Sequence, residues 1–204
     1  MSQKPTWLAA HGEPWRRGEA RVVYENPWIR VTEEDAVAPT GAPALYGVVG
    51  FKNLALAVLP IDEDGAVVLV GQHRLPFGDY SWEIPEGGGP HGEHPLDGAR
   101  RELAEEAGLN ADTWQEVLRM QLSNSVTDEL AIGYLATGLR PSAGKAEQDE
   151  TEDFSVIRVP FREALDAAVN GHIRDALTVA MLLRAYHMAR EGHLPGALAS
   201  AMLG

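Results

Sequence analysis

The chain has 204 residues, of which 30 are acidic and 17 are basic, so its formal net charge at pH 7 is -13. This negative surplus repels polyphosphate backbones at long range and argues against general binding to nucleic acids or anionic membranes. Because the chain has no cysteine, disulfides, thiolate metal sites and a cysteine nucleophile are excluded. The 45% hydrophobic content with 23% charged residues is typical of a globular protein.

The chain shows no targeting or membrane-spanning pattern. Residues 1–15 are polar and lack the apolar core of a signal peptide. No apolar stretch approaches the roughly 20 residues that a membrane-spanning helix needs. We therefore expect a soluble, cytoplasmic protein.

The first quarter of the chain predicts a small antiparallel sheet over residues 14–51. Alternating segments at 21–24, 28–32 and 45–51 favour strands, and Asn26-Pro27 favours a turn between the first two. We expect this N-terminal part, residues 1–51, to be followed by a larger domain over residues 52–204.

The rest of the chain predicts strands, a central helix, more strands and terminal helices. The expected strands are residues 54–61, 66–70, 116–122, 129–137 and 154–159, and the expected helices are residues 95–107, 161–170 and 173–190. Such an order indicates an α+β fold in which helices cover a mixed sheet. The acidic loop over residues 141–153 is expected to be the most mobile segment.

Three glutamates lie close together in the predicted helix over residues 95–107. Glu102, Glu105 and Glu106 are at positions i, i+3 and i+4, so their carboxylates share one side of the helix. Like charges at this spacing destabilise a helix unless cations lie among them. Oxygen ligands without cysteine favour a hard ion, with Mg²⁺ first and Mn²⁺ second.

A glycine-rich segment, residues 87–92, precedes this helix and allows the backbone to approach a ligand closely. Gly87 and its neighbours would then place a metal ion or its phosphate ligand. The alternative is an acidic, solvated helix after a flexible loop. The spacing favours the functional interpretation, because glycine, five residues, glutamate and seven residues precede the run Arg101-Glu102-Leu103-Ala104-Glu105-Glu106-Ala107-Gly108-Leu109.

This pattern matches every position of the Nudix box, and the chain resembles Nudix hydrolases. The resemblance implies a Nudix α/β/α sandwich and two or three Mg²⁺ ions that position a diphosphate for hydrolysis. It implies Glu102 and Glu106 as the principal metal ligands, with Glu105 assisting and with a backbone ligand from Glu86. It also implies that Glu93 pairs with Arg101 to hold the box together, although Glu93 could equally be an exposed loop charge.

Four further segments resemble ADP-ribose pyrophosphatases and related nucleoside diphosphate sugar hydrolases. They are residues 26–31, 72–78, 82–87 and 171–178. Those relatives are homodimers whose N-terminal sheet packs across the two-fold axis. The resemblance thus implies hydrolysis of ADP-ribose to AMP and ribose 5-phosphate, with GDP-mannose or another nucleotide sugar as the alternative substrate. A nucleotide-sugar sensor without catalysis and an acidic scaffold are alternatives of other classes.

Two positions depart from the ADP-ribose pattern. Asn124 replaces a proline, which predicts a less rigid loop after the box, and Glu86 stands where many members have alanine. The second departure adds a charge at the mouth of the expected metal site.

The remaining site residues are assigned by position. Glu129 resembles the family's catalytic glutamate and is the first choice for the general base, followed by Glu150 and Glu152 and then by Glu105. Arg74 is expected to bind a phosphate oxygen, with a salt bridge at the strand end as the alternative. Trp28 is a candidate for stacking on a nucleobase, although a single tryptophan is more often part of a core.

Overall fold

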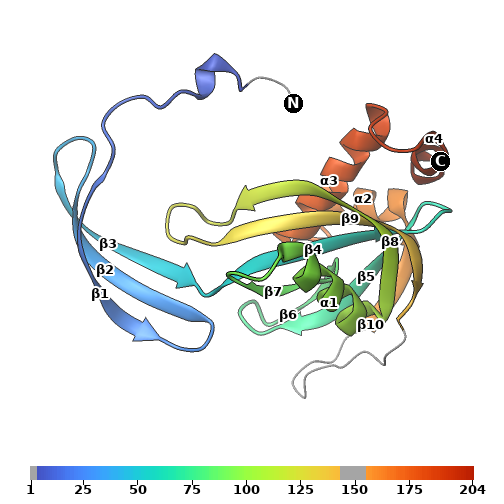
Figure 1. Ribbon diagram of the computed structural model, residues 1–204, viewed down its shortest axis with the longest axis horizontal. Helices are drawn as coiled ribbons and strands as arrows, with labels where there is room; N and C mark the ends of the chain where they lie inside the picture. The colour runs from blue at the N-terminus through green and yellow to red at the C-terminus, as the bar shows by residue number, and fades with distance from the viewer. Residues whose placement is uncertain (1–3, 143–154) are drawn as a thin grey trace. The chain divides into compact units, whose positions relative to one another are not determined.

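A computed structural model describes residues 4–142 and 155–204, and the chain divides into two compact units (Figure 1). The first unit comprises Met1–Lys52 and Ser123–Asp128, and the second comprises Asn53–Leu122 and Glu129–Gly204. Among the described residues, every helix is too short or too polar to cross a bilayer. Most of the expected mobile loop, residues 143–153, lies outside the described residues.

The first unit is a three-stranded antiparallel sheet preceded by a short 3₁₀ helix, η1 (Thr6–Leu8). Its strands are β1 (Arg16–Glu25), β2 (Ile29–Val37) and β3 (Pro43–Phe51), in the order β1-β2-β3. Asn26 forms the first turn, because its side-chain oxygen accepts hydrogen bonds from the backbone of Trp28 and Ile29 at 2.9 and 2.8 Å. This sheet confirms the predicted antiparallel N-terminal sheet.

The second unit contains a seven-stranded mixed sheet. Its strands are β4 (Asn53–Ile61), β5 (Ala66–Arg74), β6 (Asp79–Glu83), β7 (Glu86–Pro90), β8 (Leu109–Gln121), β9 (Leu130–Pro141) and β10 (Ser155–Pro160). The order is β10-β5-β4-β9-β8, with β6 paired to β5 and β7 paired to β4. Strands β4 and β9 are parallel, whereas the other paired strands are antiparallel.

Strands β4 and β5 separate after a single paired position, Ile61 with Val67. Beyond it, β4 pairs with β7 over Asn53 to Ala57, and β5 pairs with β6 over Val70 to Arg74. Only Ile84 and Pro85 connect β6 to β7, so the end of β6 lies close to the start of β7. Both ends lie where β4 and β5 have separated.

Helices cover both faces of the sheet, as Figure 1 shows. Helix α1 (Pro95–Ala107) packs on one face, and α2 (Phe161–Val169), α3 (Ala176–Arg190) and α4 (Gly196–Leu203) pack on the other. Strand β4 faces both layers, because Leu56 and Val58 join the core under α1 while Leu59 and Ile61 join the core under the other helices. The α+β sandwich with a mixed sheet is therefore confirmed.

Helix α1 begins and ends where the sequence predicts. Pro95 occupies the first turn, and His94 Nδ1 accepts a hydrogen bond from the Leu96 N–H at 3.3 Å. Gly108 ends the helix with φ of +65°, a left-handed conformation that glycine adopts without strain. This helix positions the glutamates of the predicted site.

Several boundaries differ from the prediction. Residues 87–90, part of the glycine-rich segment expected as a loop, belong to β7 because their backbone completes the free edge of β4. Helix α3 begins at Ala176 rather than at 173, since Asp175 caps it by accepting a hydrogen bond from the Thr178 N–H at 2.7 Å. Strands β8 and β9 extend beyond their predicted ranges, and β6 and α4 were not predicted.

Candidate functional site

Two of the three box glutamates on α1 are buried against strand β7. Glu102 and Glu106 are 7% and 6% exposed. The Glu106 Oε2 atom accepts a hydrogen bond from the Glu86 N–H at 2.9 Å. The Glu102 carboxylate lies over Gly87, where a Cβ atom would overlap it. Glycine at this position thus allows two acidic side chains to approach the backbone of β7.

Arg101 connects the same helix to the strand. Its Nη1 atom forms ion pairs with Glu102 at 2.7 Å and Glu105 at 3.1 Å, and its Nη2 donates to the Gly88 carbonyl at 2.8 Å. In the described part of the chain, Arg101 forms ion pairs with Glu102 and Glu105 and none with Glu93. Glu105 lies one turn after Arg101 on the same helix, a spacing that favours an ion pair.

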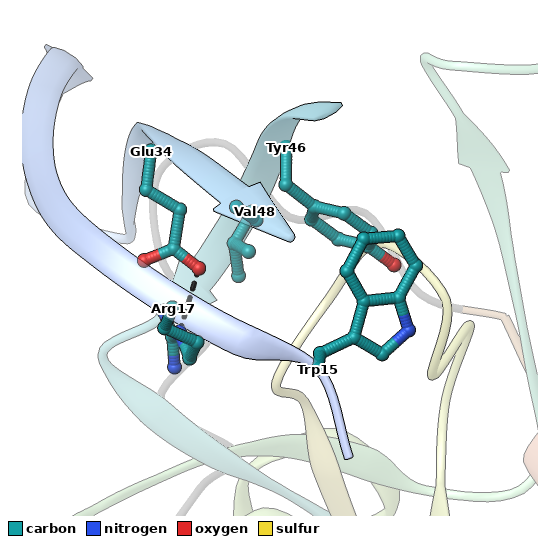
Figure 2. A pocket seen from close by; sticks show the side chains of 6 residues that line it. Trp15, Arg17, Glu34, Tyr46 and Val48 are labelled. Carbon is teal, nitrogen blue, oxygen red and sulfur yellow. Dashed lines mark hydrogen bonds and ion pairs between the residues drawn. The ribbon is translucent and has the colours of Figure 1, made fainter. Parts of the chain in front are cut away.

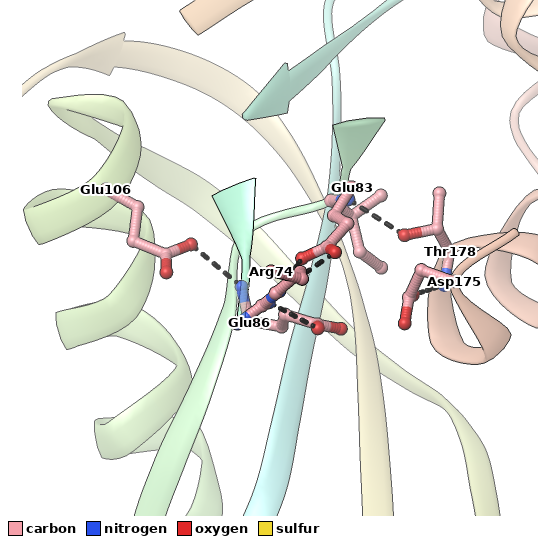
Figure 3. Close-up of polar contacts among 7 residues, drawn as sticks. Arg74, Glu83, Glu86, Glu106, Asp175 and Thr178 are labelled. Atoms are coloured by element: carbon pink, nitrogen blue, oxygen red, sulfur yellow. Dashed lines mark hydrogen bonds and ion pairs between the residues drawn. The ribbon is translucent and has the colours of Figure 1, made fainter. Parts of the chain in front are cut away.

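A second charged cluster lies where β5, β6 and β7 meet, and Figure 3 shows its residues. The Arg74 Nε atom donates to both carboxylate oxygens of Glu83, at 3.0 and 3.1 Å, and Arg74 Nη2 also pairs with Glu83. The same Nη2 pairs with Glu86 Oε1 at 3.1 Å. Arg74 thus forms the strand-end salt bridge that was the alternative to phosphate binding, through a fork geometry that favours carboxylates and phosphates alike.

The start of α3 completes this cluster. Thr178 Oγ1 accepts a hydrogen bond from the Ile84 N–H at 3.0 Å and so joins α3 to the link between β6 and β7. Asp175, the cap of α3, lies beside it, and Glu83, Glu86 and Asp175 each place a carboxylate oxygen within 4.8 Å of the other two. Sequence reasoning missed Glu83 and Asp175. Both lie in segments that carried the family resemblance, residues 82–87 and 171–178, but neither residue was singled out within its segment.

Glu86 has the most unusual environment of these acids. Its side chain is 15% exposed, and its Oε2 atom is buried without a hydrogen-bond partner. Burial raises the pKa of Glu86 well above its usual value, and the nearby charges of Asp175 and Glu83 raise it further. Arg74 opposes this shift through its ion pair with Glu86.

The other predicted site residues lie elsewhere. Glu129 is half-buried and directly precedes β9, and β4 separates β9 from β7. Two strand spacings, about 10 Å, therefore separate its backbone from that of β7.

Trp28 belongs to the first unit and is 68% exposed, so it is not a core residue of the described chain. Asn124 lies in a turn in which the Ser123 carbonyl accepts hydrogen bonds from Val126 and Thr127. Glu150 and Glu152 lie outside the described residues.

The first unit contains a small pocket lined by an ion pair and two aromatic rings (Figure 2). It is lined by Trp15, Arg17, Glu34, Ala36, Tyr46 and Val48 and encloses about 170 Å³. Arg17 Nε donates to the buried Glu34 carboxylate at 2.6 Å, and the rings of Trp15 and Tyr46 meet edge to face at 5.3 Å. This volume is smaller than that of the smallest ordinary ligand pockets, about 300 Å³, so the pocket is too small for a whole nucleotide sugar.

The donor set at α1 and β7 fits a hard divalent cation. Glu102 and Glu106 present carboxylate oxygens beside the backbone of Glu86 and Gly87, and Glu105 lies one turn from Glu102 on the same helix. Oxygen donors of this kind suit Mg²⁺ or Mn²⁺. Placing several carboxylates beside a glycine backbone is an arrangement that can hold a metal-bound phosphate.

Comparison with known proteins agrees with this geometry. Residues 52–179 match the model of the NUDIX domain, and residues 15–49 match that of the nucleoside diphosphate sugar hydrolase N-terminal domain. An ADP-ribose pyrophosphatase of Mycobacterium tuberculosis is 34% identical over 68% of this chain and 67% of its own length. One of Bacillus subtilis is 31% identical over 76% and 84%, respectively. A crystal structure of an ADP compounds hydrolase has the same fold, with a TM-score of 0.79 and 19% identity over 91% of this chain and 100% of that chain.

The Arg74–Glu83 pair generates a stability prediction. Arg74→Met leaves the Glu83 carboxylate, 3% exposed, without its main partner, so we expect a loss of about 3 kcal/mol in the free energy of unfolding. Adding Glu83→Gln to Arg74→Met should recover most of this loss, because the uncompensated charge is then removed. Urea unfolding of the two single variants and the double variant measures the coupling.

Arg119→Met is the matched control, because Arg119 pairs with Glu116 on the exposed surface of β8. It should cost less than about 1 kcal/mol. Equal losses for Arg74→Met and Arg119→Met would contradict a structural role for the buried pair.

Proposed function

The chain belongs to the NUDIX family, and we propose that it hydrolyses the diphosphate bond of a nucleoside diphosphate sugar. ADP-ribose is the proposed substrate, with AMP and ribose 5-phosphate as products. The names of the Mycobacterium and Bacillus relatives support this choice, as does the second matched domain at residues 15–49. GDP-mannose is the alternative substrate within the same reaction class.

The observation that carries the proposal is the packing of the Glu102 and Glu106 carboxylates against the backbone of Glu86 and Gly87. In an acidic scaffold the acids of one helix could stay solvated, whereas here two of them are buried, and burying carboxylates costs free energy that their contacts and a bound metal would offset. A role in metal and diphosphate binding offsets that cost. This argument favours an enzyme over an acidic, solvated helix.

We assign Glu102 and Glu106 as the principal ligands of divalent cations, with Glu105 and the Glu86 carbonyl assisting. Mg²⁺ is the proposed ion and Mn²⁺ the alternative, with two or three ions in each site. Such ions neutralise the charge of a diphosphate and lower the pKa of a bound water. Arg101 positions Glu102 and Glu105 through its ion pairs, and its bond to the Gly88 carbonyl fixes α1 against β7.

Arg74 and Gly87 are assigned to the substrate diphosphate. Arg74 is about a third exposed, and its guanidinium carries the planar donors that phosphate oxygens match. A phosphate that binds Arg74 must compete with Glu83 and Glu86 for these donors. Gly87 leaves the backbone open beside the carboxylates. Trp28 is assigned to stacking on the nucleobase, in keeping with its exposed ring.

The central test is turnover of nucleotide sugars with Mg²⁺. We expect hydrolysis of ADP-ribose to exceed that of GDP-mannose, and phosphate detection after phosphatase treatment measures both. Glu106→Gln should lower kcat by at least about 100-fold while the chain still folds, because the variant loses a charged ligand of the cations that would stabilise the transition state. Glu116→Gln, an exposed acid on β8, is the control and should retain activity.

Failure to hydrolyse any nucleotide sugar would contradict the assignment. Tight binding of ADP-ribose without turnover would instead support the sensing module. Preferred turnover of GDP-mannose would keep the reaction class and replace the substrate.

The general base is tested by comparing four glutamates. Glu129 is our first choice, Glu150 and Glu152 are the second, and Glu105 is the third. Replacing the true base with glutamine should lower kcat by about 100- to 10,000-fold with little change in KM, because a base acts in the transition state. Steady-state kinetics of Glu129→Gln, Glu150→Gln, Glu152→Gln and Glu105→Gln identify it. A larger effect at Glu150 or Glu152 than at Glu129 would overturn the first choice.

We also propose that the protein is a cytoplasmic homodimer in which residues 1–51 form the contact and residues 52–204 form the hydrolase domain. The first unit exposes several large apolar side chains, and in the described chain the outer edge of β1 pairs with no other strand. The exposed side chains are Trp15, Val22, Val23, Tyr24, Trp28 and Leu45. An apolar surface and a free strand edge of this kind favour association.

Light scattering after size exclusion tests the dimer. We expect a mass of twice the chain's 22.1 kDa for the unmodified protein. Val22→Glu, at a half-exposed position on β1, should shift the protein toward monomer by placing a charge in the apolar contact. Val169→Glu, on the exposed side of α2, should leave the mass unchanged. A monomeric unmodified protein would rule the dimer out.

A further inference from the structure

Glu83, Glu86 and Asp175 converge from three different elements. Glu83 ends β6, Glu86 begins β7 and Asp175 precedes α3, and their carboxylate oxygens lie within 4.8 Å of one another. Each position is fixed by another contact. Arg74 holds Glu83, the β4 ladder holds the Glu86 backbone, and the cap of α3 holds Asp175. The cluster is therefore built into the fold and does not depend on flexible surface side chains.

The charges of this cluster do not balance. Arg74 pairs with Glu83 and Glu86, whereas Asp175 uses one oxygen to accept the Thr178 N–H. In the part of the chain that the structure describes, this arrangement gives three carboxylates and one guanidinium. Like charges a few ångströms apart and shielded from water repel each other strongly, so a further cation would stabilise the group.

An independent observation comes from a single oxygen atom. Glu86 Oε2 is buried and accepts no hydrogen bond. Leaving a buried acceptor without a partner costs free energy, and the cost is larger for a charged group. Figure 3 shows the Glu86 carboxylate extending beyond Arg74 toward Asp175, so the unpartnered atom belongs to the cluster.

We propose that Glu83, Glu86 and Asp175 bind a hard divalent cation, such as Mg²⁺, at a site separate from that of Glu102 and Glu106. Three carboxylates with oxygen donors suit such an ion. The ion would satisfy Glu86 Oε2 and offset the excess negative charge. The site does not depend on which substrate the protein hydrolyses.

The alternation of side chains along β7 separates the two sites. Neighbouring residues of a strand point to opposite faces of the sheet. The Cβ position of Gly87 points toward Glu102 on α1, so the Glu86 side chain points to the face covered by α3. Figure 3 accordingly shows Glu106 and Asp175 on opposite sides of Glu86.

The test counts bound Mn²⁺ by electron paramagnetic resonance, with no substrate present. The background is the double variant Glu102→Gln/Glu106→Gln, in which the ligands on α1 are weakened. We expect this protein to retain one Mn²⁺ per chain that Mg²⁺ displaces. Adding Glu86→Gln or Asp175→Asn should weaken the retained ion by about tenfold or more, because either change removes a charged ligand. Asparagine keeps the cap of α3, so Asp175→Asn preserves the fold.

Glu116→Gln in the same background is the control and should leave Mn²⁺ binding unchanged. Circular dichroism and urea unfolding verify that each variant is folded. A double variant that binds no Mn²⁺, or equal affinities in Glu86→Gln and Glu116→Gln, would overturn the proposal. Because the readout needs no turnover, its failure is distinguishable from failure of the proposed hydrolysis.

Discussion

The contact between helix α1 and strand β7 organises the chemistry of this protein. It requires a residue without a side chain at Gly87, because the Glu102 carboxylate occupies that space. It also requires the Glu86 N–H to point at Glu106. Arg101 then reaches the Gly88 carbonyl and offsets the charge of Glu102. Two acids can be buried on one helix because the backbone and a guanidinium partner them.

The separation of β4 from β5 makes this contact possible. A continuous ladder between these strands would leave no edge for β7, and the glycine-rich segment would remain a loop. Because β4 pairs with β7 instead, residues 86–90 become part of the sheet and present a regular backbone to α1. The Leu56 side chain of β4 packs beside this contact, where it occupies the space that a Cβ atom at Gly89 or Gly98 would need. The fold thus produces a regular strand from a glycine-rich sequence that locally favours a loop.

The sequence predicted much of the fold and of the site, and the elements and contacts that it missed have physical explanations. Helix α1 was predicted to the residue, because Pro95, Gly108 and the apolar spacing act locally. Strand β7 was missed because glycine has no strand propensity, and only the partner strand β4 stabilises it. The contacts of Arg101 with Glu102 and Glu105 were not predicted, since the spacing of the box contains no information about side-chain direction. Asp175 is distant in sequence from Glu86, so only the tertiary fold brings them together.

The geometry around Arg74 connects the two charged clusters. Its guanidinium is held by Glu83 and Glu86 on the α3 side of β7, while Glu106 binds the backbone of the same Glu86 from the α1 side. A shift of Glu86 therefore changes the environment of Arg74 and of a box carboxylate at once. Alanine at position 86 would leave Arg74 with a single carboxylate partner and would remove the buried, unpartnered oxygen. Glutamate at this position instead couples the charges around Arg74 to the box carboxylates on α1.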